Sequence, residues 1–341
     1  MGILNLFRRR PPFRIGLFAR RPGFTIIEMA IAFIILLAIM VATYEVIVYS
    51  HISNATLSAW NGMTEWGQTI VNNINLELSQ GRVIYQNDTL GNSYLADLEM
   101  DPDLPAIGSR RLPVIDANAA LGPETTVSRT GNSLLFVQEL APFVGDANGV
   151  NRRVDVYQLV YYYLSKTDQY IGTKNESLRV IKWVSVPFAD WSQVNSIPAG
   201  NARTVFVSNL FEDPREIRYL WVPRNEPNSA FYEITSAGGI FADNSYVIER
   251  KDAQSVIGYL GAGYASVAWN SGASFDIPDN VPKYTQANPL GDGFPNGLEI
   301  QVVGPSIARV VMVRLVLAYY VVLNKCLYSN ESTTIITFHD L

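Results

Sequence analysis

The chain has 341 residues, of which 48% are hydrophobic and 17% charged, a composition suited to one large or two modest globular domains. The single cysteine, Cys326, excludes an intramolecular disulfide, and two histidines are too few for a histidine-rich metal centre. The net charge is −5, but six arginines precede Gly23 and leave a body with 20 basic and 31 acidic residues. Because this acidic body has no basic cluster, we do not expect it to bind nucleic acid.

The first expected elements are a basic leader, residues 1–23, and an apolar membrane-spanning helix, residues 24–50. Residues 29–42 include no polar side chain, and the apolar run continues to Tyr49, interrupted only by Thr43 and Glu45. A helix over residues 29–49 spans roughly 30 Å, the thickness of a bilayer core. The arginine-rich flank predicts a cytoplasmic N-terminus, with everything after Ser50 across the membrane. A secretory signal peptide and a plain single-pass anchor are the alternatives. The apolar run is too long for a signal peptide, and Gly23 lies on its cytoplasmic edge.

One carboxylate, Glu28, lies inside the apolar run near its cytoplasmic edge. A carboxylate costs about 2.5 to 3.5 kcal/mol at the centre of a membrane helix, so such a residue is expected to be functional and to have a partner. If a peptidase cuts after Gly23, the new α-ammonium of Phe24 lies about one helical turn from Glu28 and can pair with it. The same pairing between neighbouring chains would favour side-by-side assembly.

Gly23, Phe24, Thr25 and Glu28, with a basic leader before them and an apolar helix after them, closely resemble the N-terminal motif of type IV prepilins and type II secretion pseudopilins. The resemblance implies cleavage after Gly23 by a prepilin peptidase, N-methylation of Phe24 and insertion of the helix into a filament core. It also implies that other pilins or pseudopilins, an inner-membrane assembly platform and membrane lipid are partners.

Residues 51–82 are expected to continue the helix outside the membrane, with Gly81 as its stop. Gly62 and Gly67 lower the local helix propensity and make some bending possible. Apolar residues recur every three or four positions and predict a face that packs on a sheet; they are Ile52, Ala55, Ala59, Met63, Trp66, Ile70, Ile74 and Leu78.

Residues 83–341 are expected to form a strand-rich head, so the predicted fold class is α+β, with a long helix packed on an antiparallel sheet. Predicted strands are rich in β-branched and aromatic residues and cover 134–139, 154–164, 178–186, 231–235, 246–249, 298–303, 310–323 and 333–338. Two stretches rich in Gly, Asn, Ser and Pro, 188–209 and 223–295, are expected to be long loops or insertions.

A second resemblance concerns the head. The succession LLFVQEL, VDVYQLVYYYL, LRVIKWV, GFPNGLEIQVV and RVVMVRLVLAYYVV is similar in order and spacing to the W-type minor pilins and J-type pseudopilins. Those proteins follow the long helix with an antiparallel sheet. This chain departs from many major pilins because it lacks the cysteine pair of their C-terminal loop, and its Asn/Gly-rich stretches make the head larger.

No catalytic or cofactor site is expected. His51 and His339 belong to no nucleophile motif, and the glycine-rich stretches 236–239 and 261–264 lack a phosphate-loop lysine and are typical of turns. Oxygen ligands occur at short spacing in 101–103 and 291–296, and 292–299 loosely resembles a calcium loop without its regular alternation of acidic ligands. The tyrosine run 161–163 is expected to pack, with at least one ring toward solvent or a neighbour.

These observations predict a non-enzymatic minor pilin or pseudopilin of the inner membrane, present as a priming, tip or low-abundance subunit with its head in the periplasm. The alternative is a single-pass, membrane-anchored periplasmic binding protein or enzyme that does not assemble. Retention of Gly23 in the mature protein would favour that alternative.

Overall fold

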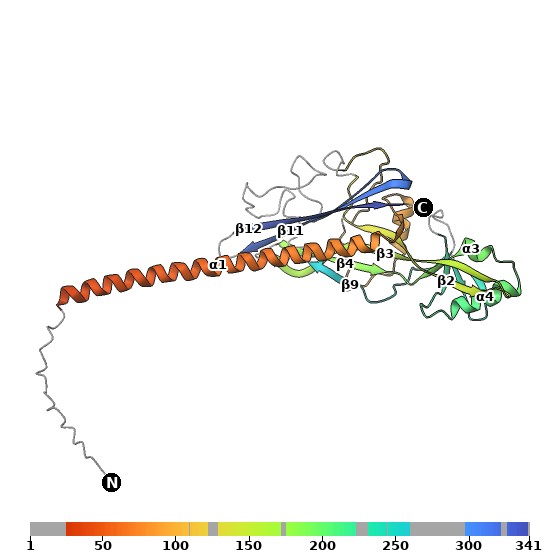
Figure 1. The fold of residues 1–341 in the computed structure, drawn as a ribbon, viewed down its shortest axis with the longest axis horizontal. Helices are drawn as coiled ribbons and strands as arrows, with labels where there is room; N and C mark the ends of the chain where they lie inside the picture. The colour runs from red at the N-terminus through yellow and green to blue at the C-terminus, as the bar shows by residue number, and fades with distance from the viewer. Residues whose placement is uncertain are drawn as a thin grey trace, which may run out of the picture. The chain divides into compact units, whose positions relative to one another are not determined.

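The structure is a computed structural model that describes residues 25–108, 110–121, 129–171, 175–222, 231–243, 245–259, 297–321 and 326–339. Two compact units, residues 1–54 and 55–341, are described separately. The helices are α1 (Ile26–Leu78), α2 (Thr89–Asp97), α3 (Trp191–Asn195), α4 (Asn201–Phe211) and the 3₁₀ turn η2 (Ser306–Ala308). The strands (Figure 1) are β1 (Gly81–Ile84), β2 (Leu134–Asp146), β3 (Asn151–Ile171), β4 (Asn175–Val184), β5 (Phe188–Asp190), β6 (Tyr219–Trp221), β7 (Phe231–Ile234), β8 (Ile240–Asp243), β9 (Ser255–Tyr259), β10 (Leu298–Val303), β11 (Arg309–Val321) and β12 (Cys326–Phe338).

The part of α1 in the first unit is apolar and unburied. Every side chain from Thr25 to Ile47 is exposed, and the stretch is long and apolar enough to cross a membrane. Its internal polar side chain Thr43 donates a hydrogen bond from Oγ1 to the carbonyl of Ile39 at 2.7 Å, so its hydroxyl is satisfied within the helix. The membrane-capable helix predicted for this part of the chain is therefore present.

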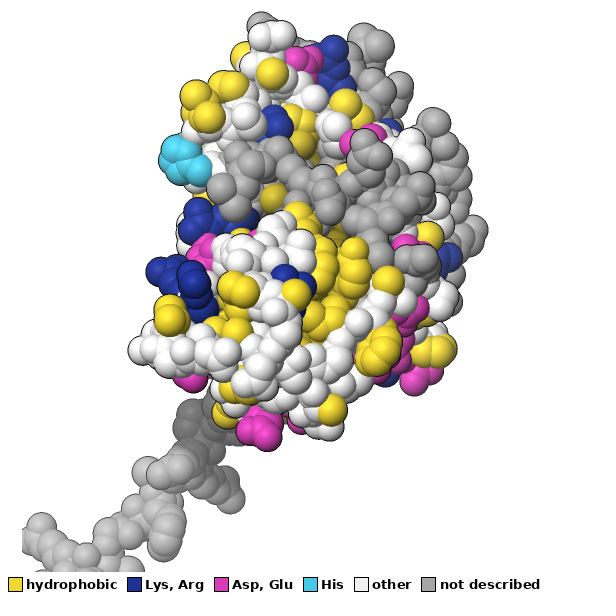
Figure 2. All heavy atoms as spheres, turned by 90° about the vertical axis from the view of Figure 1, so that its right-hand side faces the viewer, with side chains coloured by type: hydrophobic (Ala, Val, Ile, Leu, Met, Phe, Trp, Pro, Cys, Tyr) yellow, Lys and Arg dark blue, Asp and Glu magenta, His cyan; other side chains and the backbone are white. Residues whose placement is uncertain are grey.

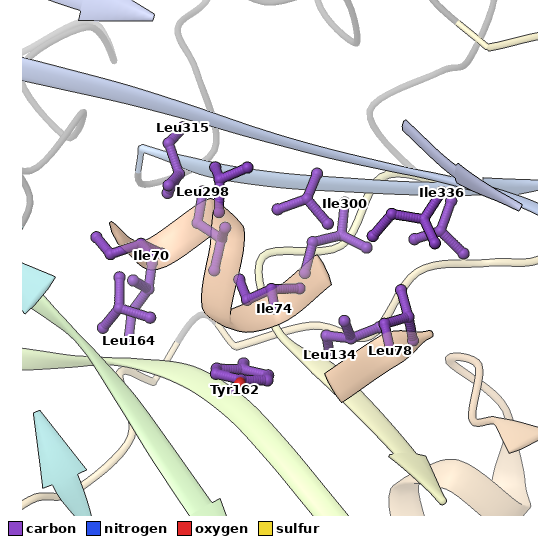
Figure 3. Close-up of a cluster of buried hydrophobic side chains, with 14 of the residues drawn as sticks. Ile70, Ile74, Leu78, Leu134, Tyr162, Leu164, Leu298, Ile300, Leu315 and Ile336 are labelled. Carbon is purple, nitrogen blue, oxygen red and sulfur yellow. The ribbon is translucent and has the colours of Figure 1, made fainter. Parts of the chain in front are cut away.

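The part of α1 in the second unit lies between two sheets (Figure 3). Ile70, Ile74 and Leu78 contact apolar side chains from both sheets. One side of this core comes from β2 to β4 and the other from β10 to β12, so the helix is covered on two sides rather than packed on one sheet. The helix ends at Leu78, four residues before the predicted boundary, and Gly81 opens β1 instead.

The buried face of α1 differs from the predicted stripe. Trp66 is 42% exposed, whereas Gly67 and Val71, which were not in the stripe, are buried together with Met63 and the residues above. The first three residues of the stripe are only half-buried; they are Ile52, Ala55 and Ala59. A helix turns about 100° per residue, which places Trp66 on the flank of the face and Gly67 near its centre. A Cβ at Gly67 would lie 2.4 Å from Oγ of Ser332 and 3.3 Å from Cδ1 of Leu317, so the glycine allows β11 and β12 to approach the helix.

Replacing Gly67 with leucine is expected to lower the free energy of unfolding by about 1 to 3 kcal/mol, because the new side chain overpacks the contact with β11 and β12. Gly62 is the matched control, since a Cβ there meets nothing within 4 Å. Gly62→Leu should be neutral or stabilising by up to about 1 kcal/mol through helix propensity. Denaturant titration of both variants in detergent checks the difference, and equal losses would contradict this account of Gly67.

The larger sheet has nine strands in the order β1-β2-β3-β5-β6-β7-β8; β4 branches from β3, and β9 pairs with β4. Its strand pairs are antiparallel except for the parallel pair β5–β6. Both faces of its centre are buried. Tyr162 lies on the α1 side, and Tyr161 and Tyr163 lie in a second, aromatic-rich core on the opposite face. All three side chains are fully buried, so the expectation of a ring toward solvent was wrong: it assumed a sheet covered on one face only.

Several predicted strands are confirmed, and others need correction. The predicted strand 298–303 has the bounds of β10, and those at 134–139, 154–164 and 333–338 lie within longer strands. Residues 246–249 form no strand. Ile248 is extended there and bonds to the backbone of Asp97 and Glu99, as an isolated bridge beside Leu98.

The stretch predicted as loop, 188–209, is ordered as β5, α3 and most of α4. These elements close a third core in which Phe206, Val207 and Leu210 of α4 pack on Val154 and Val156 of β3. Tertiary burial outweighs the low helix propensity of this β-branched sequence. The second predicted loop, 223–295, holds β7, β8 and β9 within its described residues.

Polar contacts tie the end of α1 to the larger sheet. The Glu77 carboxylate pairs with the ammonium of Lys182 on β4 and accepts a hydrogen bond from the Tyr162 hydroxyl at 2.5 Å. Burial, and then the Glu77 charge, raise the pKa of Tyr162. Because an unpaired carboxylate at this depth is costly, these bonds favour one position of the helix on the sheet.

Candidate assembly segment

A capping box opens α1. Thr25 Oγ1 accepts a hydrogen bond from the backbone N–H of Glu28 at 3.2 Å, and Glu28 Oε2 accepts from the backbone N–H of Thr25 at 2.8 Å. The Thr25 hydroxyl also donates to Oε2 at 3.0 Å. Thr25 is thus the N-cap and Glu28 the third helical residue, an arrangement that satisfies two otherwise unpaired N–H groups and favours a negative charge at the helix start.

The structure therefore gives Glu28 a partner within its own helix. Gly23 and Phe24 lie outside the described residues, so the pairing predicted between Phe24 and Glu28 stays a prediction. All three bonds of the capping box use Oε2 or Thr25 Oγ1, and Thr25 makes no bond to Oε1. The second carboxylate oxygen is thus not needed by the cap.

The role of Thr25 was missed from the sequence, although a signal for it was present. A threonine followed three residues later by glutamate, just before an apolar run, is a capping-box pattern. The cost of a charge in lipid instead pointed to a charged partner for Glu28. The structure shows that backbone groups already provide much of the compensation.

The helix after this cap is apolar on all sides. From Ile26 to Tyr49, its large hydrophobic side chains are between 44% and 84% exposed in the single chain, except for Val48, which is half-buried. A helix that is hydrophobic all round is stable only when lipid or other protein surrounds it. The segment can therefore insert into a bilayer, or into an assembly of similar helices.

The residues considered for catalysis or metal binding have different surroundings. His51 is exposed on α1, and His339 contacts the carbonyl of Ile307 through Nδ1 at 2.6 Å. Asp101 accepts from the N–H of Asp103 at 2.9 Å and pairs with Arg250 at 2.8 Å; these bonds lower its pKa. Among the described residues, no group of three or more His, Cys, Asp or Glu side chains could hold a metal ion.

The structure describes only some of the glycine-rich and calcium-like stretches. Residues 236–239 form the turn between β7 and β8, with Gly238 N–H bonded to the carbonyl of Thr235 at 2.8 Å. Residues 261–264 and 291–296 lie outside the described part of the chain. Glu299, the last residue of the calcium-like stretch, is fully buried and pairs with Arg314 at 3.2 Å, so its carboxylate has a cationic partner from the protein.

The described part of the head includes a cleft and a groove. The cleft, of about 410 Å³, lies at the end of α1 and is lined by residues that include Leu78, Phe338 and the Arg82–Glu139 pair. An open groove of about 680 Å³ includes Tyr219 and Tyr246, whose ring centroids are 3.8 Å apart. Burial and nearby carboxylates raise the pKa of Tyr219 to about 12. On the face shown in Figure 2, charged side chains of both signs are scattered among apolar ones.

Comparisons with protein-family models, with curated proteins and with solved structures give no match for this chain. What is established about this chain therefore comes from its own residues and their geometry. They establish an α+β protein with one N-terminal helix long and apolar enough to span a membrane, opened by a Thr25–Glu28 capping box and continuous with a folded head.

Proposed function

We propose that the chain is a minor pilin or pseudopilin subunit that assembles through its N-terminal helix into a type IV pilus or type II secretion pseudopilus. The observation that carries the proposal is the position of Glu28. Its carboxylate closes the first turn of an exposed apolar helix and lies five residues after Gly23, the last residue of the arginine-rich leader. A plain membrane anchor has no need of this combination.

In this proposal, a prepilin peptidase cleaves after Gly23, and Phe24 becomes the N-methylated terminus. Cleavage there leaves the Thr25 amide and the capping box intact, because the cut bond lies one residue before the Thr25 N–H. Oε1 of Glu28 then accepts a hydrogen bond from the α-ammonium of a neighbouring subunit. This ion pair neutralises both charges in the apolar filament core.

Before assembly, the chain sits in the inner membrane with its N-terminus in the cytoplasm and its head in the periplasm, in contact with lipid and the assembly platform. The arginine-rich flank supports this orientation. The head acts by association rather than by catalysis. The size of its three cores supports a priming or tip subunit rather than a repeated major one.

Processing tests the proposal directly. Gly23→Leu is expected to keep the leader attached, and Gly23→Ala to leave it partly attached, because the cleavage subsite must accept a small residue. Mass spectrometry of the N-terminus of the membrane-bound chain reads the result. A parent protein that retains Met1 and Gly23 would overturn the proposal and favour the membrane-anchored periplasmic alternative.

Two substitutions at Glu28 separate its charge from its cap. Glu28→Gln keeps an acceptor for the Thr25 N–H, since glutamine also serves in capping boxes, but removes the charge. We expect both Glu28→Gln and Glu28→Leu to be inserted and cleaved and to enter filaments poorly, with leucine worse because it also loses the cap. The measurement is the fraction of chain in sheared filaments relative to the membrane.

Glu45→Gln is the matched control, because Glu45 lies in the same exposed apolar helix but away from its first turn. It should enter filaments like the parent. Normal incorporation of both Glu28 variants would show that Glu28 is not an assembly residue.

A further inference from the structure

The outer edge of β12 is long and regular, and among the described residues no strand pairs with it. β12 has 13 residues, and its pairing with β11 runs without a bulge from Arg309↔Phe338 to Val321↔Cys326. Within the described residues, β11 is its only strand partner, so the opposite edge presents backbone N–H and C=O groups. Its last eight residues, ESTTIITF, contain no Lys, Arg, Pro or Gly. Natural edge strands usually carry such residues, or are short or covered, to prevent pairing with other chains.

The same chain protects its other edges. On the outer edge of β10, the backbone N–H and C=O of Ile300 both form hydrogen bonds with the backbone of Gly131, each at 2.9 Å. The carbonyl of Val302 accepts a hydrogen bond from the backbone N–H of Asp116 at 3.3 Å. In the nine-stranded sheet, the terminal strands β1, β8 and β9 have only four or five residues. The open edge of β12 is therefore a local exception rather than a general property of the fold.

The α1 helix holds β12 in a fixed position. Asn330 donates to Thr64 Oγ1 at 2.9 Å, and Ser332 lies against Gly67. The side chains that alternate with these face outward and are exposed; they are Glu331, Thr333, Ile335 and Thr337. A preorganised strand with β-branched outward side chains is suited to pair with an added strand, because little entropy remains to be lost on binding.

We propose that the edge of β12 from Glu331 to Phe338 binds an extended segment of a different polypeptide, which adds to the sheet as a further strand. Backbone hydrogen bonds would supply the affinity, and alternate side chains opposite Ile335 and Glu331 would supply specificity. The body of the chain after Gly23 has 11 more acidic than basic residues, so charge complementarity favours a neutral or basic segment.

Antiparallel pairing with a second copy of this chain fits the edge poorly, and this step rests on the membrane anchoring in the proposed function. β12 runs in the same direction as α1, since Thr64 lies by Asn330, and Leu78 and Phe338 line one cleft near the ends of both elements. Two-fold antiparallel pairing of two β12 edges would point the two α1 helices in opposite directions. Two copies anchored in one membrane cannot meet that requirement.

Site-specific photocrosslinking of the full chain, in the cells that produce it, tests the proposal. A benzophenone amino acid is placed in turn at Thr333, Ile335 and Thr337, and at Val144 of β2 as a control with almost the same exposure as Ile335, 61% against 62%. The three β12 probes should crosslink to one partner chain at sites that step by two residues, the period of a strand. The proposal would be overturned if the β12 probes crosslinked no more strongly than the Val144 probe, or if the crosslinked sites on the partner showed no step of two residues. A crosslinked product between two copies of this chain would also overturn it.

The variant Ile335→Lys should reduce the yield from the Thr333 probe about tenfold, because a lysine on an edge strand disfavours strand addition. Val144→Lys should leave it unchanged. Both positions are exposed, so both variants should fold, and unchanged unfolding midpoints would verify this. An undiminished Ile335→Lys yield would overturn the proposal. Mass spectrometry of the N-terminus in the same samples reads the proposed function separately, because a retained leader would contradict that function and leave the stepped crosslinks intact.

Discussion

Arg314→Leu is expected to lower the free energy of unfolding by about 3 to 5 kcal/mol, the usual cost of removing one partner from a buried ion pair. Arg314 on β11 is 3% exposed and bonds to Glu299 on β10 at 3.2 Å and to Glu331 on β12 at 2.6 Å. Burial alone would lower the pKa of Arg314, but the two carboxylates outweigh it, so the pKa is raised and the charge is retained. Without the guanidinium, the fully buried Glu299 loses the cation that bonds to it at 3.2 Å.

Two controls accompany this prediction. Denaturant unfolding in detergent gives the free energy of unfolding of every variant. Arg153→Leu breaks an exposed pair with Asp155, in which the Arg153 side chain is 64% exposed, and should cost at most about 1 kcal/mol. The double variant Arg314→Leu with Glu299→Leu should recover much of the loss, because it removes the stranded charge as well. Equal losses for Arg314→Leu and Arg153→Leu would show that burial does not set the energy of this network.

A steep loss of stability is expected as the pH rises above 10.0, the ordinary pKa of tyrosine. Burial raises the pKa values of Tyr161, Tyr162 and Tyr163, all of which have fully buried side chains. Above pH 10.0 the unfolded chain releases these protons and the folded chain keeps them. The stabilisation is therefore complete below the unfolded pKa and is lost as the pH rises toward the folded values. Each tyrosine contributes a slope of about 1.4 kcal/mol per pH unit, or about 4 kcal/mol for the three.

The measurement is the free energy of unfolding as a function of pH at constant ionic strength. Tyr162→Phe should reduce the alkaline slope by about 1.4 kcal/mol per pH unit, because one proton fewer is released on unfolding. Phe136→Leu is the matched control, since Phe136 stacks on Tyr162 with ring centroids 6.3 Å apart but does not titrate. It should lower stability at every pH and leave the slope unchanged. A flat profile through pH 10.0 would contradict the burial of the tyrosine run.

The elements predicted well are those in which local pattern and burial agree. The apolar run after Glu28 and the β-branched stretches at Leu298–Val303 and in β12 could form little else, and the structure has them. The predicted loop that became α4 failed for the opposite reason. Its sequence, NARTVFVSNLF, has a weak local preference, and the helix is stabilised by packing on strands distant in the sequence.

The candidate site shows the same limit. The positions of Glu28 and the apolar helix follow from the sequence, because hydropathy and charge are local properties. The hydrogen bonds from Thr25 to Oε2 depend on where the helix begins, and helix boundaries are weakly encoded. The burial of all three tyrosines depends on a second layer over the sheet, supplied partly by Tyr94 and Leu98 from a segment predicted only as part of the head.

The placement of α1 between two sheets determines how the head carries a pulling force. A pull along the helix in residues 55–78 acts in shear, because β12 runs alongside it and contacts it through Asn330 and Ser332. Many side chains on both sides of the helix must then slide together, and the Glu77 bonds to Lys182 and Tyr162 must break in the same step. Extraction of the helix is therefore a cooperative event with a high barrier. The rate of this extraction under load, rather than equilibrium stability alone, sets how long the two sheets stay attached to α1.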